Sequence, residues 1–246
     1  MKNTASVLVV LCPQLRLAPP IASGSATRYI DAILPARSAS LTAALMFFSF
    51  DGIDGVGKST QLTLFAQWLT DQGQQVVTCR DPGSTPLGER IRNLLLANDE
   101  QAPIHRRAEM LLYMAARAQL VEEIIRPALN AGKTVVSDRY LLANVVYQAY
   151  AGGLPLEEVR QVGEITIAGI MPDAVFLLDM EPTQADARLQ RPRDRMEQQG
   201  AEFRDRVREG FLAEARLFPR TIHVLDASRP VQEQQNAIRE IASSLL

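Results

Sequence analysis

The chain has 246 residues, of which 47% are hydrophobic, and a formal net charge of −2 at pH 7. This is enough apolar material for one packed globular domain, and the small net charge argues against a protein that binds nucleic acid or anionic lipid over its whole surface. The only cysteines are Cys12 and Cys79, in unrelated surroundings, which argues against a disulfide framework and against a cysteine metal site. We therefore expect a cytoplasmic protein with no nucleic-acid partner and no membrane partner.

The first 45 residues differ from the rest of the chain in composition. They hold four basic residues and four prolines against the single acidic residue Asp31. We expect residues 1–45 to be an N-terminal extension, either disordered or a mis-assigned start, and residues 46–246 to form a domain that is active without it.

From Met46 onward, short apolar segments alternate with segments of helical periodicity. Such alternation is typical of a parallel sheet covered by helices on both faces, so we expect a three-layer α/β fold with a five-stranded parallel sheet. The strands are expected at 47–50, 75–79, 134–137, 174–179 and 222–225. Helices are expected directly after residue 59 and at 86–97, 139–150, 156–170, 183–190, 203–218 and 230–245, and a long or broken helix is expected at 105–130.

The most specific motif lies between the first predicted strand and the helix after it. Residues 52–59 spell G-x-x-x-x-G-K-S. In this pattern the glycines let backbone N–H groups turn around an anion, Lys58 reaches the terminal phosphates, and the Ser59 hydroxyl can bind Mg²⁺. The motif predicts a P-loop NTPase-type fold that binds a nucleotide polyphosphate.

Polar residues also follow the second and third predicted strands, as Arg80-Asp81-Pro82-Gly83 and Asp138-Arg139-Tyr140. Ligands of open α/β sheets bind at the carboxyl ends of the strands. Asp138 is therefore placed to hold Mg²⁺ together with Ser59, although an aspartate also favours a helix N-cap.

The choice among phosphate-loop proteins favours a small kinase. The N-K-x-D motif of guanine switch proteins is absent, as are the signature segments of helicases and transport ATPases. A nucleoside monophosphate acceptor is largely ionised near neutral pH, so its phosphorylation requires cations that bring two polyanions together rather than a strong general base. Arginine suits this task because its planar fork binds phosphate oxygens in pairs. The candidates are Arg92, Arg117, Arg139, Arg188, Arg191, Arg193 and Arg195.

Four of these arginines lie in the segment of about residues 188–200, between two predicted helices. The segment has no apolar face, and it is either a short arginine-rich lid able to close over ATP or an ordinary solvated charge run.

Taken together, these segments resemble the thymidylate kinase family, from Met46 to the C-terminus. The resemblance is carried by Phe50-Asp51-Gly52-Ile53-Asp54-Gly55-Val56-Gly57-Lys58-Ser59-Thr60, Arg80-Asp81-Pro82-Gly83, Tyr113-Met114-Ala115-Ala116-Arg117, Asp138-Arg139-Tyr140, Tyr147-Gln148 and Asp194-Arg195-Met196-Glu197. It implies an enzyme that phosphorylates dTMP to dTDP with ATP as donor and Mg²⁺ as cofactor, in a homodimer.

The resemblance also implies the residues that bind the acceptor. Tyr113 would stack on thymine, Arg117 would donate to a base carbonyl, and Tyr147 would occupy the space of a ribose 2′-hydroxyl. The polar edge of the base would face Asn144 and Gln148. The acceptor phosphate would be held by Arg92 and Arg139, with Asp81 orienting the acceptor or Mg²⁺.

For the donor, the implied ATP-binding residues are Gly52, Ile53, Asp54, Gly55, Val56, Gly57, Lys58, Ser59, Thr60 and Arg193. The implied catalytic residues are Lys58, Asp54, Asp138, Arg139, Arg191 and Arg195, with Asp54 also near the sugar 3′-hydroxyl. Family members place a cation over the transferring phosphate either in the glycine loop or in the lid. Since Ile53, Asp54 and Val56 are not basic, we expect the lid to supply it here. The chain departs from the usual family pattern at Asp81, usually Glu, and at Ser84, usually Gly.

Two alternatives remain open at this stage. A kinase of deoxynucleosides or of another monophosphate would share the glycine loop and the Asp138-Arg139-Tyr140 segment, but a deoxynucleoside carries a neutral hydroxyl and would need a general base. A non-catalytic nucleotide-binding protein would bind ATP without releasing ADP in response to dTMP.

Overall fold

The computed structural model describes residues 46–97, 101, 103–189 and 195–246. The expected extension, residues 1–45, lies outside the described residues, as do Arg191 and Arg193 of the expected lid. Among the helices of the described ranges, none has both the length and the apolar character needed to cross a bilayer.

The strands are β1 (Phe47–Asp51), β2 (Val76–Arg80), β3 (Thr134–Asp138), β4 (Ala174–Asp179) and β5 (Ile222–Asp226). They pair in parallel in the order β2-β3-β1-β4-β5, so the expected five-stranded parallel sheet is confirmed. Phe48 lies opposite Val136 of β3 and Ala174 of β4, which makes β1 the central strand. The chain crosses from one side of β1 to the other after β3, and this topological switch point is where such sheets bind ligands.

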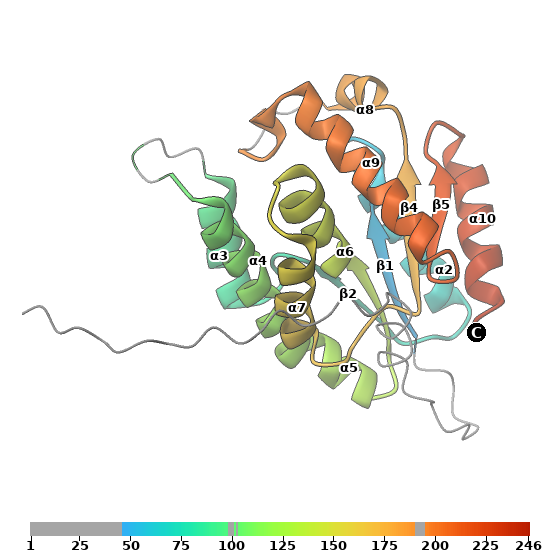
Figure 1. Cartoon of the computed structure of the whole chain (residues 1–246). Helices are drawn as coiled ribbons and strands as arrows, with labels where there is room; N and C mark the ends of the chain where they lie inside the picture. The colour runs from blue at the N-terminus through green and yellow to red at the C-terminus, as the bar shows by residue number, and fades with distance from the viewer. Residues whose placement is uncertain (1–45, 98–100, 102, 190–194) are drawn as a thin grey trace, which may run out of the picture. The chain divides into compact units, whose positions relative to one another are not determined.

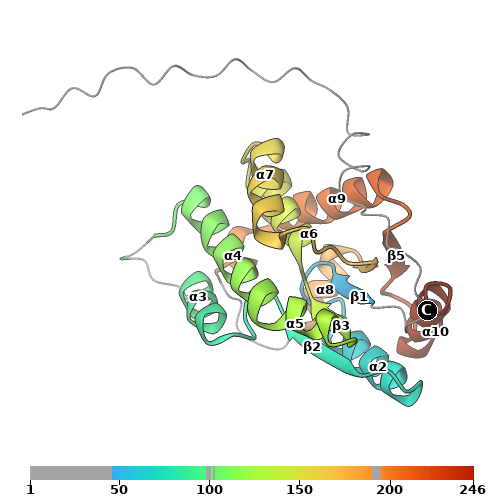
Figure 2. The ribbon, with the colours of Figure 1, turned by 90° about the horizontal axis from the view of Figure 1, so that it is seen from below.

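The helical segments are α2 (Lys58–Asp71), α3 (Pro86–Leu96), α4 (Arg106–Leu120), η1 (Val121–Ile125), α5 (Arg126–Asn130), α6 (Leu141–Asn144), η2 (Val145–Ala151), α7 (Leu156–Ile167), α8 (Pro182–Arg188), η3 (Glu197–Gln199), α9 (Ala201–Leu217) and α10 (Val231–Ser243). Helices α2 and α10 cover one face of the sheet, and α4, α7 and α9 cover the other (Figures 1 and 2). The three-layer prediction is therefore confirmed.

Successive side chains of β1 point to opposite faces of the sheet and so contact both helical layers. Phe48 and Phe50 point to the α2 face, where their rings lie 5.1 and 5.8 Å from the ring of Phe65. Phe47 points to the opposite face, with its ring 5.0 Å from that of Tyr140 in an edge-on contact. Such fully buried aromatic contacts fix the central strand, and so fix the loop that follows it.

Two expected helix boundaries are wrong for local reasons. The helix expected from residue 139 begins at Leu141, because Arg139 has a left-handed φ of 66°. The helix expected to reach residue 170 ends at Ile167, because Ala168 is also left-handed. The long or broken helix expected at 105–130 is broken by the π-helical turn η1, and a second π-helical segment, η2, follows α6. Wide turns of this kind are frequent at functional sites.

Candidate active site

The phosphate loop runs from the end of β1 to the start of α2, and two of its glycines are required by its path. Gly52 has a φ of 133°, and a Cβ atom there would overlap the carbonyl oxygen of Leu178. Gly55 has a φ of 89°, and its Cβ would overlap the carbonyl oxygen of Ala185. Only glycine tolerates both this backbone conformation and this close approach. The loop is thereby held against the end of β4 and against α8.

Lys58 is the first residue of α2, and its side chain is buried in the loop. Its Nζ donates to the carbonyl oxygens of Gly52, at 3.1 Å, and Ile53, at 2.8 Å, and lies 3.3 Å from Asp54 Oδ1. Burial and the charge of Arg139 lower the pKa of Lys58, whereas Asp54 opposes them. The ammonium group is thus positioned at the N-terminus of a 14-residue helix, where an anion is favoured.

A cavity of about 400 Å³ opens at this loop. It is lined by Asp54, Gly55, Gly57, Lys58, Ser59, Thr60, Arg80, Asp81, Arg92, Asp138, Arg139 and Leu189. Its basic side chains and the helix N-terminus make it suitable for a polyphosphate. Of the expected donor residues that the structure describes, six line this cavity: Asp54, Gly55, Gly57, Lys58, Ser59 and Thr60. Gly52, Ile53 and Val56 are buried and do not line it.

The same cavity has the oxygen donors that Mg²⁺ requires. Ser59 lies in the first turn of α2 and Asp138 at the end of β3, and both line the cavity. Within the described ranges, no three His, Cys, Asp or Glu side chains gather as a metal cage. Mg²⁺ in nucleotide sites typically takes only one or two protein ligands and completes its shell with phosphate and water, so these residues fit the ion.

A second cavity, of about 100 Å³, lies beside the first. It is lined by Asp54, Asp81, Pro82, Arg92, Leu96, Tyr113, Arg117, Arg139, Ala143, Asn144, Tyr147, Gln148 and Met196. All of the residues expected to bind the acceptor are in this set. The apolar residues Pro82, Leu96 and Met196 were not expected to line it, although Pro82 and Met196 lie in segments that carry the family resemblance.

An ion pair stands where the two cavities meet, since Asp54 and Arg139 line both. The Nη2 atom of Arg139 lies 2.8 Å from Asp54 Oδ1. Although burial raises the pKa of Asp54, the charges of Arg139 and Lys58 lower it well below its usual range. The other terminal nitrogen of Arg139, Nη1, is buried and has no hydrogen-bond partner. A buried guanidinium N–H without a partner calls for an acceptor, and a ligand phosphate at the junction would supply one.

The base end of the second cavity is built on α4 and on the end of β2. Arg117 is fully buried, and its Nε lies 2.6 Å from Oδ2 of Asp81, while its Nη2 donates to the Tyr140 carbonyl at 3.2 Å. Burial raises the pKa of Asp81, and the charge of Arg117 opposes this. Asp81 thus binds the arginine expected to contact the base, a partnership that the sequence did not indicate.

Tyr147 closes the cavity on the side of α9. Its ring packs 6.2 Å from those of Phe203 and Phe211, and its hydroxyl lies 3.4 Å from Arg139 Nη2. These contacts hold the ring beside the Asp54–Arg139 pair.

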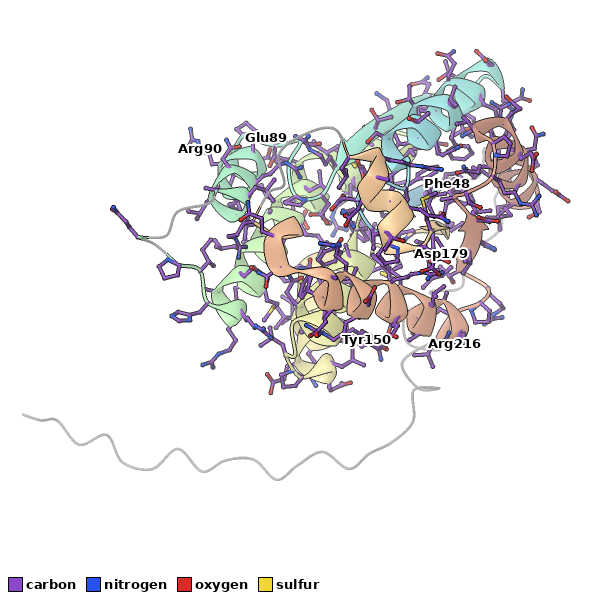
Figure 3. All side chains as sticks on the ribbon, turned by 90° about the horizontal axis from the view of Figure 1, so that it is seen from above. Phe48, Glu89, Arg90, Tyr150, Asp179 and Arg216 are labelled. Atoms are coloured by element: carbon purple, nitrogen blue, oxygen red, sulfur yellow. The ribbon has the colours of Figure 1, made fainter. Side chains whose placement is uncertain are left out.

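Ser84, where the family usually has glycine, is left-handed with a φ of 65°. Its hydroxyl accepts a hydrogen bond from the Arg80 backbone N–H at 2.8 Å, and its own N–H donates to Glu89, on α3 (Figure 3), at 2.7 Å. These bonds hold a conformation that costs a non-glycine residue free energy.

The described part of the expected lid has two anchored arginines. Arg188 donates to the carbonyl of Ala227, and Arg195 donates to the Leu95 carbonyl at 2.8 Å and pairs with Glu109 of α4. Arg195 is therefore held beside the acceptor cavity, and it is not one of the described residues that line the phosphate-loop cavity.

Figure 3 shows the molecule from the side to which the strands point in Figure 1. Asp179, the last residue of β4, lies there between α8 and α9. Arg208 of α9 pairs with it at 2.8 Å, so this ion pair ties α9 to the edge of the sheet that carries the site.

The sequence profile of the thymidylate kinase family matches residues 50–238. The chain belongs to the thymidylate kinase family. A thymidylate kinase of Symbiobacterium thermophilum is 44% identical over 204 residues, which cover 82% of this chain and 94% of that protein. A thymidylate kinase of Bifidobacterium longum subsp. infantis is 43% identical over 203 residues, which cover 82% of this chain and 87% of the relative.

Among solved structures, thymidylate kinase from Ehrlichia chaffeensis matches with a TM-score of 0.66 and 30% identity, over 80% of this chain and 98% of that one. Membership in the thymidylate kinase family identifies the chain as a kinase, and this neighbour shares its fold. The resemblance found in the sequence is thus confirmed at the level of family, fold and enzyme class.

Proposed function

We propose that the protein transfers the γ-phosphoryl group of ATP to dTMP and releases dTDP and ADP, with Mg²⁺ as cofactor. The observation that supports this best is the junction of the two cavities. One is lined by the phosphate loop and the other by Tyr113, Arg117 and Asn144, and both share the Asp54–Arg139 pair. Two nucleotides bound there would meet phosphate to phosphate.

In this proposal the donor lies along the phosphate loop. The loop N–H groups and Lys58 bind the phosphates, and Ser59 with Asp138 would hold Mg²⁺, which neutralises phosphate charge. The acceptor lies in the second cavity, with thymine against Tyr113 and Arg117 and its phosphate on Arg92 and Arg139.

An oxygen of the acceptor phosphate attacks the γ-phosphorus of ATP. The bond between that oxygen and the γ-phosphorus forms, the bond from the γ-phosphorus to the β,γ-bridging oxygen breaks, and its electrons leave with ADP. No proton is removed from the acceptor, because its phosphate is already largely ionised near neutral pH. The site therefore acts by positioning and by charge, with Arg139 placed between the reacting groups. Arg191 of the expected lid is a further candidate cation, whereas Arg195 pairs with Glu109 beside the acceptor cavity.

We also propose a cytoplasmic homodimer. The large apolar side chains exposed on α3, α4 and α7, namely Leu87, Leu94, Leu111 and Ile165, support a subunit interface. Light scattering after size exclusion measures the molar mass and so tests the dimer, and a monomer at micromolar concentration would contradict it.

A coupled ADP-release assay tests the acceptor. The purified protein, with ATP and Mg²⁺, is given dTMP, other nucleoside monophosphates and thymidine in parallel. We expect the highest kcat/KM with dTMP. We expect no turnover of thymidine, because its neutral hydroxyl would need a general base and the proposed mechanism uses none. If thymidine were turned over as fast as dTMP, the result would favour a deoxynucleoside kinase. If ADP were released at the same rate with and without an acceptor, the result would contradict the proposal.

A further inference from the structure

A buried chain of hydrogen bonds leads away from the base end of the acceptor cavity. The amide Nδ2 of Asn144 donates to Oε1 of Gln148 at 2.7 Å, and Nε2 of Gln148 donates to Oε1 of Glu109 at 3.0 Å. The other carboxylate oxygen of Glu109 accepts from Nη2 of Arg195. Asn144 and Gln148 line the cavity, whereas Glu109 lies behind them on α4. All three are at most 7% exposed, so water competes little for these bonds.

The donor and acceptor groups of these side chains fix the direction of the hydrogen bonds. A carboxylate paired with a guanidinium accepts hydrogen bonds and donates none, so the amide NH₂ of Gln148 must face Glu109. The amide oxygen of Gln148 then faces Asn144, which must present its own NH₂. The remaining atom, Asn144 Oδ1, is buried and has no hydrogen-bond partner. It is an acceptor left open in a cavity-lining residue.

We infer that Glu109 is a positioning residue that determines base specificity by orienting Gln148 and Asn144. This rests on the proposed function. A fixed acceptor at Asn144 suits the N3–H donor of thymine, whereas cytosine presents a lone pair at N3 and would leave two acceptors facing each other. Glu109 thus selects against cytosine without touching the base.

The variant Glu109→Gln tests the direction of the chain. An arginine has donors only, so the single side-chain oxygen of the introduced glutamine would be taken by Arg195. Its NH₂ group would then face Gln148, both amides would turn over, and Asn144 would present a donor. We expect KM for dTMP to rise about tenfold or more, and the ratio of kcat/KM for dTMP to that for dCMP to fall by about tenfold or more, with a smaller change in kcat.

Glu109→Ala is the matched control, since it removes the carboxylate without reversing the chain. A role in packing alone predicts that alanine is at least as harmful as glutamine and that neither changes the dTMP to dCMP ratio. That result would overturn the inference. If wild-type protein failed to phosphorylate dTMP, the proposed function itself would fail, which is a distinct outcome.

A binding measurement on the wild-type protein needs no variant, and it tests the acceptor at Asn144 on which the inference about Glu109 depends. N3-methyl-dTMP lacks the N3–H donor. By calorimetry it should bind at least about tenfold more weakly than dTMP, while equal affinities would show that no acceptor is held at Asn144 and would overturn the inference.

Discussion

Nε of Arg117 and Oδ2 of Asp81 lie 2.6 Å apart, and both side chains are buried in the wall of the acceptor cavity. Asp81→Ala would leave the guanidinium buried without its carboxylate. We expect the free energy of unfolding to fall by about 3–5 kcal/mol and KM for dTMP to rise about tenfold or more. Denaturant unfolding and steady-state kinetics measure the two effects.

The control for this change is Glu122→Ala, which removes an exposed partner of Arg126 on the same helical stretch. Exposed pairs contribute about 1 kcal/mol or less. If Asp81→Ala were no more harmful than this control, the buried pair would not stabilise the site.

Lys58→Met tests the donor cavity. Lys58 lines only the phosphate-loop cavity, so we expect kcat to fall by about 10²-fold or more with little change in the affinity for dTMP. Lys133→Met, just before β3 at the opposite end of the sheet, should leave kcat unchanged. Equal kcat values for the two variants would contradict the role of Lys58.

Arg139→Lys tests the junction. Lysine keeps the charge but cannot bind Asp54 and a phosphate with separate nitrogens of one planar group. We expect kcat/KM for dTMP to fall by about 10²-fold, with KM for ATP changing much less. Arg126→Lys serves as the control and should leave both quantities unchanged. If Arg139→Lys weakened kcat/KM for ATP as much as kcat/KM for dTMP, the result would argue against Arg139 as an acceptor-phosphate residue.

Asp51, the last residue of β1, should make stability depend on pH. Burial raises its pKa from 3.8 to about 7, although Arg139 and Lys58 oppose this. The folded protein binds this proton more tightly than the unfolded chain does, so the stabilisation is complete below the unfolded value and is lost as the pH rises through 7.

Asp51→Asn is neutral at every pH. It should therefore lessen the fall in Tm between about pH 5 and about pH 8, and raise Tm relative to wild type at the upper end. Thermal unfolding without nucleotide measures this. Parallel Tm profiles for the two proteins would contradict the assignment.

Much of the fold could be predicted because each strand is a short apolar run bounded by polar residues. Every strand lies within a residue or two of its expected position, for example β4 at Ala174–Asp179. The π-helical turns could not be predicted, since their sequences, such as Val121–Ile125, fit the periodicity of an ordinary helix equally well. The late start at Leu141 depends on the left-handed Arg139, which the packing of the site imposes.

The residues of the site could be predicted from their motifs, but not their partners. The pairing of Asp81 with Arg117 joins residues 36 positions apart, and that of Glu109 with Arg195 joins residues 86 positions apart. Such contacts depend on how α4 packs against the sheet and against the segment that holds Arg195, which local sequence does not specify.

Transfer of a labelled phosphate tests the central claim most directly. The protein is incubated with ATP labelled at the γ-phosphate, Mg²⁺ and dTMP, and the products are separated. We predict that the label appears in dTDP, in amounts equal to the ADP formed, and that Lys58→Met and Arg139→Lys both slow its appearance. Label released as inorganic phosphate at a rate that is independent of dTMP would contradict direct transfer between two nucleotides at this junction.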